Sequence, residues 1–124
     1  MGEWGVGMPA ALLLEEFGSQ VWAAFGHPPC LVGSVLQTTD WRDVDVRVIL
    51  PDEEYEEMGL GEPAENQQRF NGKWVSLCLA YSALGKQMTG LPIDFQIQQR
   101  TFANANHQGG RSSLGHIPLR MLKP

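Results

Sequence analysis

The segment VDVRVIL at 44–50 constrains the fold of this chain more than any other stretch. Valine or leucine occupies every second position, and Asp45, Arg47 and Ile49 stand between them. Successive side chains of a strand point to opposite faces of a sheet, so this alternation predicts a strand with at least one covered face. A chain of 124 residues can bury one core of this kind but not two. We therefore expect a single domain spanning residues 1–124.

Two segments have the periodicity of amphipathic helices, which could cover such a sheet. The first runs over residues 9–25, and the second over 72–89, where Asn71 is the expected N-cap. The expected buried stripes consist of Leu13, Leu14, Phe17, Val21 and Ala24 in the first helix, and of Trp74, Leu77, Cys78, Tyr81, Leu84 and Met88 in the second. We also expect Trp22 to lie in the core, and Trp41 either to do so or to stack on a base.

Two further segments are expected to be strands. The apolar run LVGSVL occupies 31–36, and residues 92–98 alternate, with Ile93, Phe95 and Ile97 on one side. Between the strand at 44–50 and the second helix, residues 51–70 are expected to form a loop with one or two helical turns. The order helix, strand, strand, helix, strand predicts an α/β (α+β) fold, in which a small mixed β-sheet is packed by helices on one side.

Charge is distributed unevenly along the chain. Residues 52–65 contain seven of the fourteen acids and no base, whereas the chain beyond Phe95 contains four bases and no acid. One interpretation is a solvated acidic loop followed by a flexible, basic, Gly-rich tail at 101–124. The other is that the tail returns toward a phosphate-bearing ligand. The net charge of −5 argues against broad nonspecific binding to nucleic acid.

Composition also limits where the protein functions. No apolar run approaches the roughly 20 residues that cross a bilayer, and the N-terminus has no basic region typical of a secretory signal. We expect a cytoplasmic protein with no membrane contact. Cys30 and Cys78 are interpreted as small buried hydrophobes rather than a disulfide, and no His or Cys cluster indicates zinc.

Three acids stand in or beside the expected strands, where carboxylates are uncommon. Asp43 and Asp45 are separated by one residue and so project from the same side of the sheet, while Asp94 follows Ile93 in the later strand. Each has a structural explanation: the DxD could face solvent, and Asp94 could pair with Arg47 or Arg100. As a group, three carboxylates on one face repel unless a cation lies between them. Mg²⁺ suits such an oxygen-only site, and two ions are the usual arrangement for displacement at phosphorus.

The sequence resembles the DNA polymerase beta-type nucleotidyltransferase superfamily in three motifs. These are VGS at 32–34, DVDV at 43–46 and IDF at 93–95, and the resemblance covers roughly residues 9–100. It implies a nucleotidyltransferase-like fold in which Gly33 and Ser34 contact a nucleoside triphosphate. It also implies that Asp43, Asp45 and Asp94 are catalytic and hold two Mg²⁺ ions. Arg42 and Arg111 are further candidates for nucleotide binding.

Three functions follow as hypotheses. The first is a magnesium-dependent nucleotidyltransferase that moves a nucleoside monophosphate, from ATP or another triphosphate, to a hydroxyl of an unknown protein or nucleic-acid acceptor. The second is a nucleotidyltransferase-fold binding module, such as an antitoxin-like partner subunit or a homo-oligomer. It is favoured by the short connection from Ser34 to Asp43, which lacks the Arg-Gly common in that family, and by the lack of an acceptor-binding domain. The third is a small metal-dependent nuclease.

Overall fold

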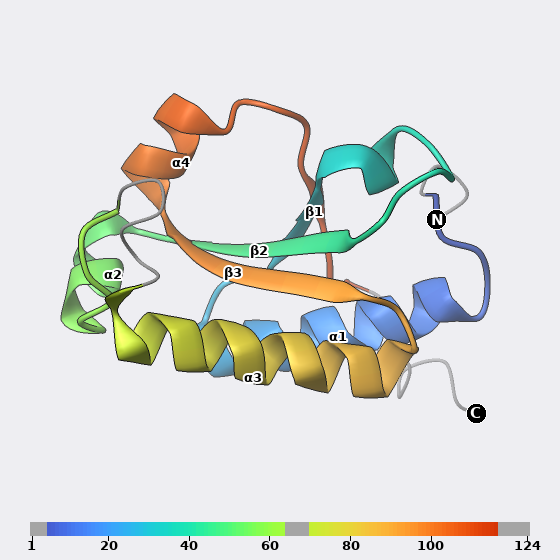
Figure 1. The fold of residues 1–124 in the computed structure, drawn as a ribbon, viewed down its shortest axis with the longest axis horizontal. Coiled ribbons are helices and arrows are strands. Elements are labelled where there is room, and N and C mark those ends of the chain that lie inside the picture. Colours follow the sequence, from blue (N-terminus) through green and yellow to red (C-terminus); the bar gives the residue numbers. More distant parts are fainter. Residues whose placement is uncertain (1–4, 64–69, 117–124) are drawn as a thin grey trace.

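The computed structural model describes residues 5–63 and 70–116 and contains one four-stranded sheet with helices on both faces (Figure 1). Glu65, Arg120 and Lys123, counted above, lie outside the described residues. The elements are, in chain order, α1 (Ala10–Phe25), β1 (Cys30–Val32), the 3₁₀ helix η1 (Gly33–Leu36), β2 (Val44–Leu50), α2 (Asp52–Glu57), α3 (Gly72–Thr89), β3 (Ile93–Gln99), α4 (Arg100–Asn106) and β4 (Ser112–Ser113).

The sheet is mixed, with the strand order β3-β2-β1-β4. The two long strands β2 and β3 run parallel, as expected for strands joined by a crossover that contains a helix. The short strand β1 runs antiparallel to β2 on one side and to β4 on the other. A mixed α/β architecture is therefore confirmed.

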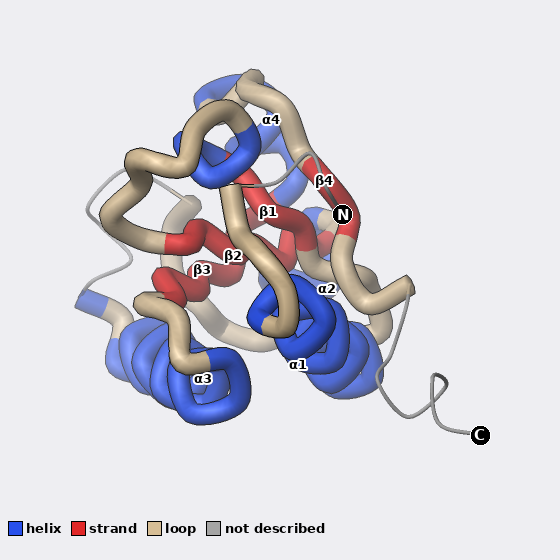
Figure 2. The backbone as a smooth tube through the Cα atoms, turned by 90° about the vertical axis from the view of Figure 1, so that its right-hand side faces the viewer, coloured by secondary structure: helices blue, strands red, loops and turns tan. Residues whose placement is uncertain are grey.

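The long helices α1 and α3 lie side by side against one face of the sheet (Figures 1 and 2). The alternate residues of β2, from Val44 to Leu50, point into this layer and are at most 2 % exposed. Phe95 of β3 meets Phe17 of α1 there in an edge-to-face arrangement, with ring centroids 6.4 Å apart. This core leaves the intervening polar residues of β2 and β3 on the opposite face.

The opposite face carries Cys30, Asp45, Arg47, Asp94 and Gln96, and we call it the polar face. The short helix α4 lies above it (Figure 1). Helices therefore do not pack on one side only, in contrast to the expectation from the sequence. The long helices α1 and α3 do share a side.

Two segments differ from the expected structure. The strand expected at 31–36 ends at Val32, because Gly33 takes a left-handed conformation with φ of 78° and turns the chain into η1. The segment from residue 101, for which a flexible tail is one of two interpretations, forms most of α4 and all of β4 within the described residues. The side chain of Gln99 caps α4 by accepting a hydrogen bond from the Phe102 amide.

The helical stripes are confirmed at most positions and wrong at two, because Ala24 and Leu84 are exposed. The separate expectation that Trp22 lies in the core is also wrong: Trp22 is exposed and contacts the ring of His116. Gly85 and Thr89 are buried in α3, where Gly85 permits close contact with Ile93 and Phe17. No helix among the described residues is long and apolar enough to cross a membrane.

Candidate carboxylate site

The parallel pairing of β2 and β3 brings two of the predicted site residues together. Asp45 and Asp94 are register partners, so their side chains leave neighbouring strands at the same level of the polar face. Their side chains are 27 % and 42 % exposed, which leaves both carboxylates accessible from solvent. The flanking residues Val44, Val46 and Phe95 are buried on the other face and fix this orientation. The core packing of two strands thus holds two acids side by side.

Arg47, the next residue along the polar face, lies against both acids. Its Nη2 is 3.8 Å from Oδ1 of Asp45 and 3.6 Å from Oδ2 of Asp94. Its Nη1 donates hydrogen bonds to the carbonyl oxygens of Asp94, at 2.6 Å, and of Val46, at 3.2 Å. The possibility that Asp94 pairs with Arg47 is therefore confirmed.

The surroundings of Asp45 disfavour its charged form. Burial is the main cause that raises the pKa of Asp45 above its usual value, and the Arg47 guanidinium opposes this effect. The neighbouring charges of Asp94 and Asp43, and a side-chain hydrogen bond with Asp94, raise the pKa of Asp45 further. The net effect is that the surroundings of Asp45 favour its protonated form, even though one guanidinium lies beside it.

The turn between β1 and η1 packs directly against Asp45. A Cβ atom at Gly33 would lie 2.6 Å from Oδ2 of Asp45, so only glycine allows the backbone to come this close. Val32, the residue before it, is the register partner of Asp45. The Gly-Ser motif and the second acid of the DxD motif are therefore neighbours in the structure.

The other predicted site residues lie around this centre. Asp43 precedes β2, is exposed, and is close enough for its charge to act on Asp45. Ser34 is exposed in η1, and Arg42 is exposed beside Asp43. Among the described residues, the ion pairs of Asp45 and Asp94 are formed by Arg47, and Arg42 forms none with these two acids.

Arg111 is held by a residue of α4 and the residue that follows this helix. It donates hydrogen bonds to Oδ1 of Asn104, at 2.9 Å, and to the carbonyl oxygen of His107, at 3.1 Å. Burial raises the pKa of the Cys30 thiol, and the charges of Arg111 and Arg47 oppose this, which places both guanidinium groups near Cys30. The interpretation of Cys30 as a buried hydrophobe is thus only partly correct, because it lies half-buried between two cations.

The donor set suits a hard divalent cation, since it consists of carboxylate oxygens. Within residues 5–63 and 70–116, however, no group of three or more Asp, Glu, His or Cys side chains is already arranged to hold a metal ion. Asp45 and Asp94 form the adjacent pair, and Asp43 is the exposed third carboxylate. The residues fit a metal by chemistry, with Arg47 as the cation now nearest to the pair.

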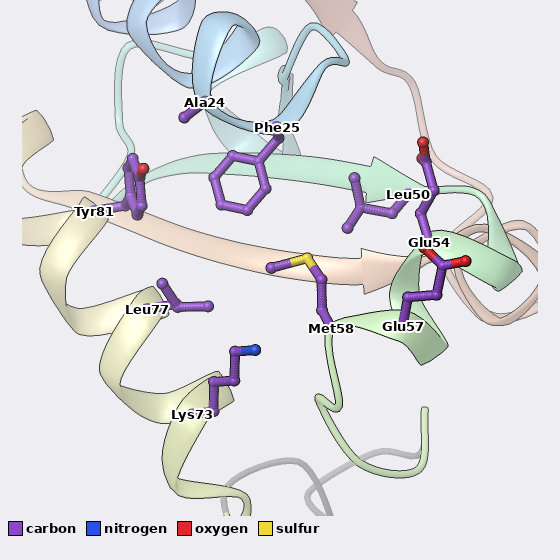
Figure 3. A pocket seen from close by; sticks show the side chains of 9 residues that line it. All are labelled: Ala24, Phe25, Leu50, Glu54, Glu57, Met58, Lys73, Leu77 and Tyr81. Carbon is purple, nitrogen blue, oxygen red and sulfur yellow. The ribbon is translucent and has the colours of Figure 1, made fainter.

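A separate pocket of about 550 Å³ lies on the helical side of the sheet (Figure 3). Phe25, Leu50 and Tyr81 form apolar walls, and Glu54 and Lys73 stand on opposite sides of it. Leu50 belongs to the buried face of β2, opposite to the face that carries Asp45. This pocket is therefore not part of the carboxylate site.

Sequence reasoning missed how closely Arg47 is bound into the site and how Arg111 is held. The signal for Arg47 was its spacing: it is two residues after Asp45 in an alternating strand, so both side chains share a face. Trp41, the other residue considered for base recognition, is half-buried, and its Nε1 donates to the carbonyl oxygen of Gly5 at 2.7 Å. Its indole therefore packs with the core, as one of the two interpretations predicted.

Comparison of the chain with protein-family models, with curated proteins and with solved structures finds no match.

Proposed function

We propose that this protein is a magnesium-dependent nucleotidyltransferase with a nucleotidyltransferase-like fold, and that Asp43, Asp45 and Asp94 are its metal ligands. The observation that carries the proposal is the register pairing of Asp45 with Asp94 on an accessible face, with the Gly33 turn packed against Asp45. Two adjacent carboxylates and a glycine turn are the parts needed to hold a cation beside a polyphosphate.

The reaction would transfer a nucleoside monophosphate from a triphosphate to an acceptor hydroxyl. A bond forms between the hydroxyl oxygen and the α-phosphorus. The bond between the α-phosphorus and the oxygen that bridges it to the β-phosphorus breaks, and pyrophosphate leaves. When bound, Mg²⁺ would neutralise the charge that develops on the phosphate oxygens. Asp94, the most exposed member of the strand pair, is the candidate to accept the proton of the hydroxyl.

The remaining residues would position the substrate. The backbone at Gly33 lies against Asp45, and the exposed Ser34 follows it in η1, so both residues are candidates to contact the phosphates. Arg111, held by Asn104 and His107, and the exposed Arg42 are candidate cations for the triphosphate. The acceptor, a protein or a nucleic acid, and a cytoplasmic location remain parts of this proposal.

Isothermal titration of the protein with each nucleoside triphosphate, with and without Mg²⁺, tests the proposal. We expect magnesium-dependent binding that the double variant Asp43→Ala/Asp45→Ala loses. The matched control removes two exposed acids outside the site, Asp40 and Glu53, by substitution with alanine. Absence of binding of every triphosphate to the wild-type protein would contradict the proposal.

One observation favours a second candidate function, a binding module without catalysis. Arg47 already places a positive charge beside both carboxylates, and this charge offsets part of their repulsion without a metal ion. Such a module would act as a partner subunit or as a homo-oligomer. It predicts a stable complex that forms equally well when Asp43, Asp45 and Asp94 are all changed to alanine, together with no binding of triphosphates.

A further inference from the structure

Arg47 is fixed in place by main-chain atoms rather than by the carboxylates alone. The hydrogen bond from its Nη1 to the Asp94 carbonyl is short, at 2.6 Å, and the side chain is only 11 % exposed. Its Nη2 stays 3.6 Å or more from the carboxylate oxygens of Asp45 and Asp94, which is longer than a hydrogen bond. Hydrogen bonds to main-chain carbonyls therefore hold the guanidinium, and it lies beside the carboxylates without a hydrogen bond to their oxygens.

The fixed charge has two opposite consequences for the site. The positive charge of Arg47 offsets part of the repulsion between the two acids. The same positive charge repels a divalent cation that approaches these acids. A side chain that stabilises the pair without metal must therefore weaken its binding of metal.

We propose that Arg47 is a positioning residue that keeps Asp45 and Asp94 adjacent and lowers the affinity of the carboxylate site for a free divalent cation. This inference rests on the proposed function, because it takes these carboxylates as metal ligands. It also explains why the pair is compatible with a folded structure before any metal is bound. The electrostatic repulsion between the two neighbouring carboxylates is reduced by the guanidinium of Arg47.

Isothermal titration calorimetry of the whole protein with Mn²⁺ alone tests the inference without any measurement of activity. Mn²⁺ prefers the same oxygen ligands as Mg²⁺. We expect Arg47→Met to bind Mn²⁺ at least about tenfold more tightly than the wild type, because a nearby positive charge is removed. Arg47→Lys keeps the charge and should restore weak binding.

The matched control is Arg100→Met, which removes an equal charge at an exposed position outside the site. It should bind Mn²⁺ as the wild type does. Circular dichroism and urea unfolding establish that each variant is folded. If Arg47→Met does not fold, Arg47→Gln replaces it, since the glutamine amide can still donate to the Asp94 carbonyl.

The outcomes separate this inference from the proposed function. Equal affinities for Mn²⁺ in the wild type and the uncharged Arg47 variants would overturn the inference, while magnesium-dependent binding of triphosphate would still support the function. Equal tightening in Arg100→Met would also overturn it, because net charge alone would then explain the effect. Absence of Mn²⁺ binding in every variant would overturn it too, and the triphosphate titration would then decide the proposed function separately.

Discussion

Gly33 is the residue at which backbone conformation and the candidate site depend on each other. Its φ of 78° is in the left-handed region, and a Cβ there would lie 2.6 Å from the Asp45 carboxylate. Gly26 has nearly the same φ, 77°, but a Cβ there would meet nothing within 4 Å. Substitution of Gly26 therefore tests backbone strain alone, whereas substitution of Gly33 tests backbone strain together with a steric clash with the Asp45 carboxylate.

We predict that Gly33→Ala and Gly26→Ala each lower the free energy of unfolding by about 1–2 kcal/mol, because both place a side chain at positive φ. Only Gly33→Ala should also displace Asp45 and weaken magnesium-dependent binding of triphosphate, by about tenfold or more. Urea unfolding and calorimetric titration of both variants measure these effects. Equal loss of binding in the two variants would show that the contact with Asp45 is unimportant.

Asp45 itself gives a prediction about stability and pH. Because the pKa of Asp45 is raised in the folded protein, the folded state holds this proton more tightly than the unfolded chain does. The contribution of this bound proton to the free energy of unfolding is fully present below the ordinary Asp pKa of 3.8. It is lost as the pH rises through the pKa of Asp45 in the folded protein. Asp45→Asn has no such proton to lose.

We therefore expect Asp45→Asn to gain stability relative to the wild type as the pH rises from about 3 to 7, although it loses binding of metal and triphosphate. Urea midpoints measured across this range test the expectation, with Asp40→Asn as a control at an exposed carboxylate. A relative loss of stability with rising pH would mean that the Arg47 contact outweighs burial at Asp45.

The site could be predicted from the sequence only in part, for a physical reason visible at Asp94. Alternation along one strand places Asp43 and Asp45 on the same side as Arg47. The position of Asp94 opposite Asp45 depends on the parallel register of β2 and β3, which no local pattern specifies. The same register brings the Asp94 carbonyl within reach of Arg47.

At the scale of elements, α4 is a helix whose position depends on tertiary contacts more than on its own sequence pattern. The Asp52 carboxylate at the start of α2 accepts hydrogen bonds from the hydroxyl and the amide of Thr101, at 2.5 and 3.0 Å. These hydrogen bonds lower the pKa of Asp52, with the hydroxyl as the larger cause. The first turn of α4 is thus attached to another element 49 residues earlier in the chain.

We predict that Asp52→Ala loosens α4 without unfolding the protein. Hydrogen exchange of the amides in residues 101–106 should become several-fold faster, whereas exchange in α3 should not change. The wild type should show the same loosening as the pH falls through the lowered pKa of Asp52, because the charged carboxylate is the better acceptor. Glu53→Ala, at the exposed neighbouring acid, is the control and should leave α4 unchanged.

The elements that sequence reasoning placed correctly are those in which a pattern repeats. In α1, α3, β2 and β3, alternating or helical positions meet a single large core, and many residues agree on one structure. In contrast, β1 and β4 have only three and two residues, and α4 is a helix of seven residues, too short to show a repeated pattern. Their conformations are decided by a glycine turn, a cap from Gln99 and a partner strand, and a tertiary contact outweighs local propensity in each case.

At the scale of the whole molecule, the segment after β4 joins the end of the described chain to its beginning. Leu114 is fully buried, and its amide donates to the Pro29 carbonyl at 2.8 Å. The next amide, of Gly115, donates to the buried carboxylate of Glu15 in α1 at 2.9 Å. A Cβ at Gly18 would lie 2.5 Å from the Leu114 Cβ, so α1 and this segment are in direct contact.

These contacts predict that Leu114, which lies beyond residue 101, contributes strongly to the stability of the fold. Leu114→Ala should lower the free energy of unfolding by about 2–5 kcal/mol, because it leaves a cavity between α1 and the sheet. Leu79→Ala, at a position that is 66 % exposed in α3, should change it by no more than about 0.5 kcal/mol. Urea unfolding compares the two. Equal, small effects would mean that residues 112–116 do not pack on α1 in solution. A large difference would mean that the chain completes its core only when its last described residues return to the first helix, so removing this segment would affect the whole domain.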